Sequence, residues 1–189
     1  MRHKYETRGI VLSRSPVGEA NMLVTLLTPD LGLVRARAQG LRRSGAKLAT
    51  SLKTFAESDV VLVRGKDSWR IAGAVLVEDW FERLGGAEPR MRTGRICSLL
   101  LRLVAGETHD PALFTIIRGF FDALATFPEV LHESAEILAA LRVLRALGLD
   151  AGEISSAEPA FAPELLAEVT KNRTSYISRI NNSIDASGL

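Results

Sequence analysis

The spacing of apolar residues changes once along this chain, close to the segment Gly85-Gly86-Ala87-Glu88-Pro89. Before this segment, short apolar runs alternate with turn residues, a pattern that is typical of strands. After it, apolar residues recur every three or four positions, which is typical of amphipathic helices. Glycine and proline interrupt both patterns at the junction. We therefore predict two domains, a β domain over residues 1–84 and a helical domain over residues 85–189.

The first domain is predicted to contain five strands. Turn signals separate the first three, at residues 16–18 and again at residues 29–32. The third strand, LVRARAQ, alternates between two faces and places its valine and alanines on the inner one. Five strands without an intervening helix favour a small closed or partly closed barrel. The predicted strands cover residues 9–12, 22–27, 33–39, 59–65 and 68–79.

The second domain is predicted to consist of helices. Apolar residues over 113–124 follow an i, i+3, i+4 spacing, and Asp110-Pro111 supplies an N-cap and a first-turn proline. A further helix over 137–147 is expected to end at Gly148. Other helices are predicted over residues 95–104, 165–169 and 176–184.

The composition is that of a globular protein, with 47% hydrophobic and 24% charged residues among 189. No apolar run reaches the roughly 18–20 residues that a membrane-spanning helix needs. The start of the chain, MRHKYETRGIVL, lacks the apolar region of a signal peptide. These features indicate a cytoplasmic protein.

The sequence contains few of the motifs that are typical of enzymes. It lacks a nucleophile elbow, a phosphate-binding glycine loop and a zinc-protease motif, and its histidines are far apart. Cys97 is the single cysteine, which excludes an internal disulfide and favours a buried thiol. Glu78 and Asp79 could bind a metal, but a solvated strand end is the better interpretation. We predict no enzyme activity, no cofactor and no metal.

Positive charge is concentrated in the first part of the chain. Residues 1–79 hold 13 lysines and arginines against 8 acidic residues, whereas residues 80–189 hold 11 against 14. In a strand, Arg35 and Arg37 point to the same face about 6.6–7 Å apart, close to the phosphate spacing of an extended nucleic-acid strand. Three more cations follow on a flexible, glycine-hinged segment, where backbone amides could also approach phosphates. They are Arg42, Arg43 and Lys47.

A barrel of the OB type binds oligonucleotides on its second and third strands and through the loops joining strands 1–2 and 4–5. The predicted strands place Arg35 and Arg37 on the third strand, Arg14 in the first loop, and Arg64 and Lys66 in the second. We therefore predict an N-terminal five-stranded OB-fold barrel whose cations converge on one groove and follow a phosphate backbone. The alternative is an exposed basic strand without a partner.

Few aromatic side chains accompany these cations. Residues 1–79 contain Tyr5, Phe55 and Trp69 as candidates for base stacking, and Phe55 is expected in the core. Contacts should therefore be mainly to phosphates, independent of sequence and sensitive to salt. A protein that holds the backbone and leaves base edges free could let a second strand pair, which is the basis for expecting annealing.

Three segments of the first domain resemble, in order and spacing, the N-terminal domain of the bacterial recombination mediator family RecO. They are TRGIVLSRSPVGEANMLVTLLTPDLG, VRARAQGLRR and KLATSLKTFAE, within residues 6–80. The resemblance implies an OB-fold followed by a helical domain, and binding and annealing of single- and double-stranded DNA in repair and homologous recombination. It also implies work with RecR to load RecA on DNA coated by single-strand-binding protein. The resemblance implies that the basic face of the family corresponds in this chain to Arg35, Arg37, Arg42, Arg43 and Lys47.

The resemblance further implies that the helical domain receives the C-terminal tail of single-strand-binding protein in an apolar pocket flanked by basic residues. Arg142 and Arg145 are candidates for this pocket, with ordinary surface arginines as the alternative. Two departures stand out: Cys97 alone cannot form the four-cysteine zinc site of many members, and the chain is short for the family. A different class of function is also open, an OB-type adaptor that acts through protein contacts and has little DNA affinity.

Overall fold

The computed structural model of the chain describes residues 3–43, 45–66, 68–104, 110–154 and 160–188. The elements are β1 (Lys4–Val17), β2 (Asn21–Thr28), β3 (Gly32–Ala38), β4 (Ala56–Arg64), β5 (Trp69–Asp79), α1 (Trp80–Arg83), α2 (Ala87–Leu103), α3 (Pro111–Thr126), η1 (Glu129–Leu131), α4 (His132–Ala146), α5 (Pro163–Lys171) and α6 (Arg173–Ala186). They form two compact units. The first holds the strands and α1 through Arg83, with a segment that ends at Phe114, and the second holds the other helical residues from Leu84 onward. The domain boundary between residues 84 and 85 stays a prediction.

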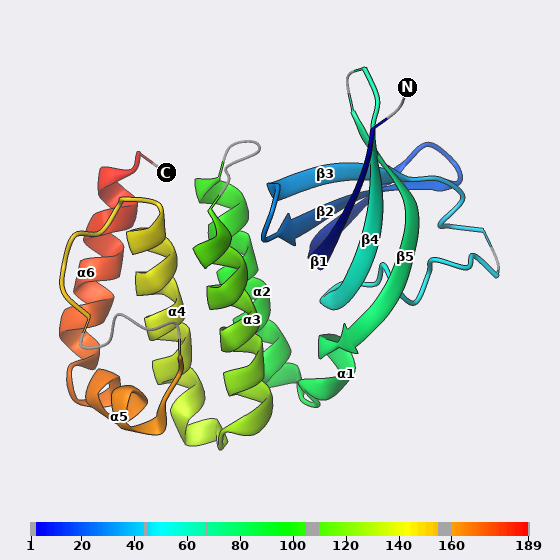
Figure 1. Cartoon of the computed structure of the whole chain (residues 1–189). Coiled ribbons are helices and arrows are strands. Elements are labelled where there is room, and N and C mark those ends of the chain that lie inside the picture. The colour runs from blue at the N-terminus through cyan, green and yellow to red at the C-terminus, as the bar shows by residue number, and fades with distance from the viewer. Residues whose placement is uncertain (1–2, 44, 67, 105–109, 155–159, 189) are drawn as a thin grey trace. The chain divides into compact units, whose positions relative to one another are not determined.

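The first unit is a closed five-stranded barrel with the strand order β1-β2-β3-β5-β4 (Figure 1). Neighbouring strands are antiparallel, except that β3 and β5 run parallel where they close the barrel. Apolar side chains from every strand fill the interior, among them Val11, Val24, Val34, Leu62 and Ile71. The structure thus confirms the predicted OB-type barrel followed by helices.

β1 is longer than the apolar run that signals it. Its buried residues, Gly9–Leu12, match the predicted strand, but its ladder with β2 continues to the pair Val17–Asn21. The segment predicted as a long turn is therefore mostly strand, and the turn shrinks to residues 18–20 with Gly18 at a φ of 64°. The prediction was wrong because this end of β1 is largely exposed, so its side chains follow no apolar pattern.

The connection from β3 to β4 contains the basic segment that follows β3. Leu41 and Leu52 are buried in the barrel core, and Leu48 packs against that core. At the start of the connection, the Arg42 N–H donates to the Ala20 carbonyl at 3.1 Å. The connection is therefore attached to the barrel on both sides of its cations.

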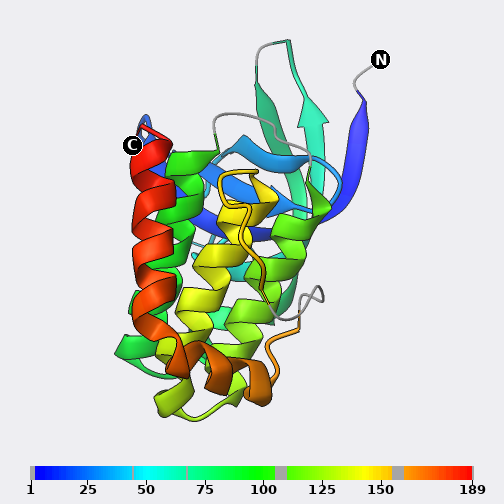
Figure 2. The same ribbon diagram turned by 90° about the vertical axis from the view of Figure 1, so that its left-hand side faces the viewer.

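α4 is the central helix of the second unit. Most of its residues are buried, and it contacts α2, α5 and α6. Figures 1 and 2 show α4 and α6 standing side by side. Gly148 follows the end of α4 with a φ of 72°, and the Leu149 N–H donates to the Leu144 carbonyl at 2.8 Å. This is the hydrogen bond that satisfies a late carbonyl where a helix stops at glycine.

α2 begins earlier than its apolar spacing predicts. It starts at Ala87 with Pro89 in its first turn, so the last three of the five residues of the predicted junction are helical. Proline is tolerated there because first-turn N–H groups have no partner within the helix. Asp110 lies before α3 as predicted, and its Oδ1 accepts a hydrogen bond from the Ala112 N–H at 2.8 Å. Among the described residues, no helix has both the length and the apolar character needed to cross a membrane.

Candidate nucleic-acid interface

β3 presents positive charge outward because its small apolar residues are needed inside. Val34, Ala36 and Ala38 are buried in the barrel, whereas Arg35 and Arg37 are exposed. This is the division of faces that the alternating sequence predicts.

A groove of about 590 Å³ lies where the start of β1, the end of β3 and the β4–β5 hairpin meet. Four of the side chains that line it are cationic: Arg37, Arg64, Lys66 and Arg70. No carboxylate lines it in the part of the chain that the structure describes. Clustered cations repel one another and concentrate a positive potential in a concave site, which favours an anionic partner. We call this site the barrel groove.

The strand pairing that closes the barrel also brings two of these cations together. β3 and β5 pair in parallel at Ala36–Trp69 and at Arg37–Arg70. Paired residues point to the same face of the sheet, so the Arg37 and Arg70 side chains lie next to each other in the groove. Arg70 was not predicted, because its place beside Arg37 depends on a contact between strands that are far apart in the sequence. The OB strand order, which sets the third strand beside the fifth, was the signal that could have found it.

Two aromatic rings lie in the barrel groove. Trp69 is buried, and the Arg64 guanidinium lies 4.8 Å from its ring centroid. Tyr5, from β1, meets Trp69 edge to face, with ring centroids 5.2 Å apart and an angle of 78° between the planes. Phe55 is buried outside the groove and stacks with Phe81 at 6.5 Å. The groove therefore combines four cationic side chains with the two rings Tyr5 and Trp69.

Arg14 and Arg42 do not line the barrel groove and are used within the unit itself. Arg14 lies on β1 and not in a loop, and its guanidinium donates to the Leu52 carbonyl at 3.2 Å. Arg42 donates to the Gly18 carbonyl at 3.1 Å. Each guanidinium therefore ties the β3–β4 connection to β1 or to the turn that follows it.

The remaining predicted cations divide between the groove and the outer surface. Arg64 is the last residue of β4 and Lys66 follows in the hairpin, and both line the groove with Arg37. Arg35, Arg43 and Lys47 are exposed but do not line it. The structure thus brings together three of the eight predicted DNA-binding residues and adds Arg70 to them.

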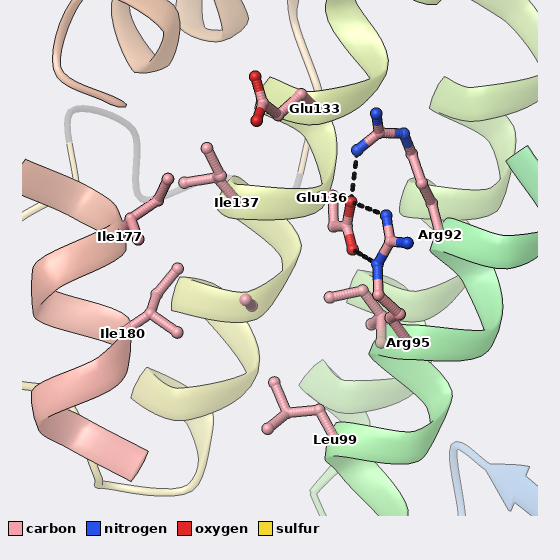
Figure 3. Close-up of a pocket in the computed structure, with 10 residues that line it drawn as sticks. Arg92, Arg95, Leu99, Glu133, Glu136, Ile137, Ile177 and Ile180 are labelled. Atoms are coloured by element: carbon pink, nitrogen blue, oxygen red, sulfur yellow. Dashed lines mark hydrogen bonds and ion pairs between the residues drawn. The ribbon is translucent and has the colours of Figure 1, made fainter. Parts of the chain in front are cut away.

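A second groove, of about 440 Å³, lies among α2, α4 and α6 (Figure 3). Its apolar lining consists of Ile96, Leu99, Ile137, Ala140, Ile177 and Ile180. Glu136 accepts hydrogen bonds from Arg92 at 2.5 Å and from Arg95 at 2.5 and 2.8 Å. The hydrogen bond with Glu136 raises the pKa of Arg95. Two guanidinium groups therefore stand beside an apolar surface and share one carboxylate. We call this site the helical groove.

The two arginines predicted to bind a partner tail have different surroundings. Arg142 is only 6% exposed, its Nη2 donates to the Ala160 carbonyl at 3.0 Å, and its guanidinium lies 4.9 Å from the ring centroid of Phe161. Burial lowers the pKa of Arg142. Arg145 is exposed near the end of α4. Neither residue lines the helical groove.

The residues considered for catalysis or metal binding have structural roles. Glu78 accepts a hydrogen bond from Arg83 at 3.1 Å, and Asp79 forms an ion pair with Lys53. Burial raises the pKa of the Cys97 thiol to about 12, so the reactive thiolate is scarce at neutral pH. Within the described ranges, no group of three His, Cys, Asp or Glu side chains is placed to hold a metal ion.

Residues 1–80 match the family model described as recombination protein O N terminal. This segment is therefore a RecO N-terminal domain. The RecO segment contains every strand of the barrel and all four cations of the barrel groove. The helical groove lies outside it.

Curated RecO proteins match a longer part of the chain. The DNA repair protein RecO of Dehalococcoides mccartyi (strain ATCC BAA-2266 / KCTC 15142 / 195) is 29% identical over 122 residues, which cover 65% of this chain and 48% of that protein. The DNA repair protein RecO of Thermobifida fusca (strain YX) is 34% identical over 155 residues, which cover 77% of this chain and 59% of that protein. The chain thus spans about half the length of the curated RecO proteins it matches.

Proposed function

We propose that this RecO-family chain is a non-enzymatic DNA-binding protein of repair and homologous recombination, and that the barrel groove holds the phosphate backbone of single- and double-stranded DNA. The observation that carries the proposal is the set of four cations, from β3, β4, β5 and the hairpin between the last two, in one groove without a described carboxylate. Phosphate contacts of this kind carry no sequence information. Binding is therefore expected to be independent of sequence.

The number of groove cations sets the expected salt dependence. Four phosphate contacts give a slope of about −3 for log affinity against log salt with a single strand, and slightly steeper with a duplex. Removing two of the contacts should roughly halve that slope. The slope therefore counts phosphate contacts, which an affinity at one salt concentration does not.

The test is a salt titration of a fluorescent strand of about 30 nucleotides on the intact chain and on the variant Arg37→Glu/Arg70→Glu. The matched control is Arg102→Glu/Lys171→Glu, which makes the same charge change at exposed positions of α2 and α5. We expect the groove variant to bind at least tenfold more weakly with a flatter slope, and the control to bind like the parent. Equal losses in both variants would mean that only the net charge matters, and the barrel groove would be rejected as the site.

We further propose that the chain anneals complementary strands and works with RecR to load RecA on DNA coated by single-strand-binding protein. The support for these activities is the family and a groove that holds backbone while leaving base edges accessible. Annealing of two complementary labelled strands should slow in the groove variant and not in the control. If the parent chain binds RecR or single-strand-binding protein but shows no salt-dependent DNA binding, the adaptor function is the correct one.

The helical groove is the proposed site for the C-terminal tail of single-strand-binding protein. Its support is the apolar lining beside Arg92 and Arg95, which suits a peptide with apolar side chains and a terminal carboxylate. Because Glu136 already occupies both guanidinium groups, a carboxylate of the tail has to compete with it.

Two substitutions with opposite expected signs test this site. Glu136→Gln removes the carboxylate that both arginines share, while Arg92 keeps its ion pair with Glu88, and should tighten binding of a fluorescent tail peptide severalfold. Ile180→Glu puts a charge into the apolar lining and should weaken it by tenfold or more. Binding that neither substitution changes would place the tail elsewhere, with Arg145 as the next residue to test.

A further inference from the structure

The two rings of the barrel groove differ in what they can offer to a ligand. Trp69 is 5% exposed, and both Arg64 and Tyr5 lie against it. It therefore has no open face for a flat ligand. Tyr5 is 38% exposed and lies at the start of β1, in the same groove as the four cations.

The geometry of the ring pair leaves part of Tyr5 accessible. The two ring planes meet at 78°, so Trp69 covers at most one face of the Tyr5 ring. The contact also limits the ring's freedom, because Trp69 is itself fixed by burial and by pairing of its backbone with Ala36. An aromatic ring that is held in place loses little conformational entropy when a second ring stacks on it.

We propose that Tyr5 stacks on one base of a single strand whose phosphates lie on the groove cations. The proposal rests on the proposed function of the barrel groove and adds a preference for DNA with accessible bases. A base offers an aromatic face whatever its identity, so stacking adds affinity without sequence preference. The bases of a duplex are already stacked on one another, so a duplex gains only the phosphate contacts. Tyr5 is thus the residue that makes the groove favour single strands.

The test compares three probes of equal length, about 15 nucleotides: a mixed-sequence single strand, the same backbone with abasic sites throughout, and a duplex. Two variants separate stacking from packing. Tyr5→Phe keeps the aromatic face, whereas Tyr5→Leu keeps an apolar contact with Trp69 but removes that face. Val75→Ala, at an exposed position of β5 that does not line the groove, is the surface control. Thermal unfolding of each variant checks that the barrel is intact.

We expect Tyr5→Leu to weaken binding of the single strand about fivefold to tenfold, as for the loss of one base–aromatic stack. Binding of the abasic strand and the duplex should stay within twofold of the parent, and the salt slope should not change because no phosphate contact is lost. Tyr5→Phe and Val75→Ala should bind all three probes like the parent.

Three results would overturn the inference. If the parent binds the abasic strand as tightly as the normal one, no base is stacked, while the phosphate groove remains supported. If Tyr5→Leu weakens all three probes equally, the ring supports the groove structurally and does not contact a base. If the parent shows no salt-dependent binding to any probe, the proposed function of the groove fails and this inference fails with it.

Discussion

Arg42 and Arg43 are adjacent in the sequence and carry the same charge, yet the structure uses them differently. The Arg42 guanidinium donates to the Gly18 carbonyl, and its N–H donates to the Ala20 carbonyl. Both contacts hold the β3–β4 connection against the turn between β1 and β2. Arg43 is exposed. At the residue scale, the stability of the connection should therefore depend on Arg42 and not on Arg43.

Removing the Arg42 side chain should destabilise the barrel without touching its groove. A single exposed hydrogen bond from a charged donor contributes about 1 kcal/mol or less. We expect Arg42→Ala to lower the Tm by about 2 °C. Arg43→Ala, the matched control, should leave the Tm unchanged in the same thermal unfolding experiment. The reverse order of the two variants would show that the Gly18 contact contributes nothing to stability.

At the scale of elements, an ion pair between Asp150 and Arg179 joins the segment that follows α4 to α6. The Arg179 Nε donates to Asp150 Oδ1 at 2.6 Å, and its Nη1 donates to the Glu153 carbonyl at 2.9 Å. Asp150 is buried, and the hydrogen bond from Arg179 lowers the pKa of its carboxyl against the opposing effect of burial. A side chain at Gly152 would collide with the guanidinium. The backbone of the segment that follows α4 therefore packs closely against the Arg179 guanidinium.

The lowered pKa of Asp150 sets the sign of a pH effect. A carboxyl whose pKa is lower in the folded state adds stability above its unfolded pKa of about 3.9, and this stability is lost as the pH falls further. We expect Asp150→Asn to cost about 2 kcal/mol of unfolding free energy at pH 7, because a charged hydrogen-bond pair is lost. The difference from the parent should shrink as the pH falls below about 4, because the unfolded parent then binds a proton that the folded carboxyl, with its lower pKa, binds only at a lower pH.

Urea unfolding of the two proteins across pH 2–7 measures this difference. Glu164→Gln, which neutralises an exposed carboxylate of α5, serves as the control and should differ little from the parent at any pH. A difference between Asp150→Asn and the parent that does not change with pH would mean that the carboxyl charge is not what stabilises this segment.

The elements show what the sequence could predict and what it could not. The alternation in LVRARAQ predicted the two faces of β3, because one face of that strand is buried along its whole length. The same logic missed the second half of β1, which is largely exposed, and the first turns of α2, whose residues are mostly polar and half-buried, so neither segment has an apolar pattern. The sequence did not predict that Arg70 lies beside Arg37, because that contact joins two distant strands. For the same reason it did not predict that Arg92 and Arg95 bind Glu136, which lies on another helix. Local periodicity reports burial within one element and does not report which elements are neighbours.

At the scale of the whole molecule, charge is divided unevenly along the chain. Residues 1–79 carry an excess of cations and residues 80–189 an excess of carboxylates, so the molecule is nearly neutral. Long-range attraction to DNA is therefore weak compared with that of a uniformly basic protein, and binding should depend on the local charge of the barrel groove.

The contact that closes the barrel has a further consequence. In the described residues, β3 and β5 pair at just two positions, and one of them, Arg37–Arg70, belongs to the groove. With so few ladder contacts, separation of these two strands is expected to be the least costly local unfolding event of the barrel. A phosphate that contacts both arginines would oppose that event, so DNA occupancy and local opening are thermodynamically linked. DNA at a free concentration of 100 times its Kd should raise the unfolding free energy by about 2.7 kcal/mol. It should also slow amide hydrogen exchange first in β5 around Trp69–Ile71. Slower amide hydrogen exchange that is confined to other strands would contradict this coupling between DNA binding and strand separation.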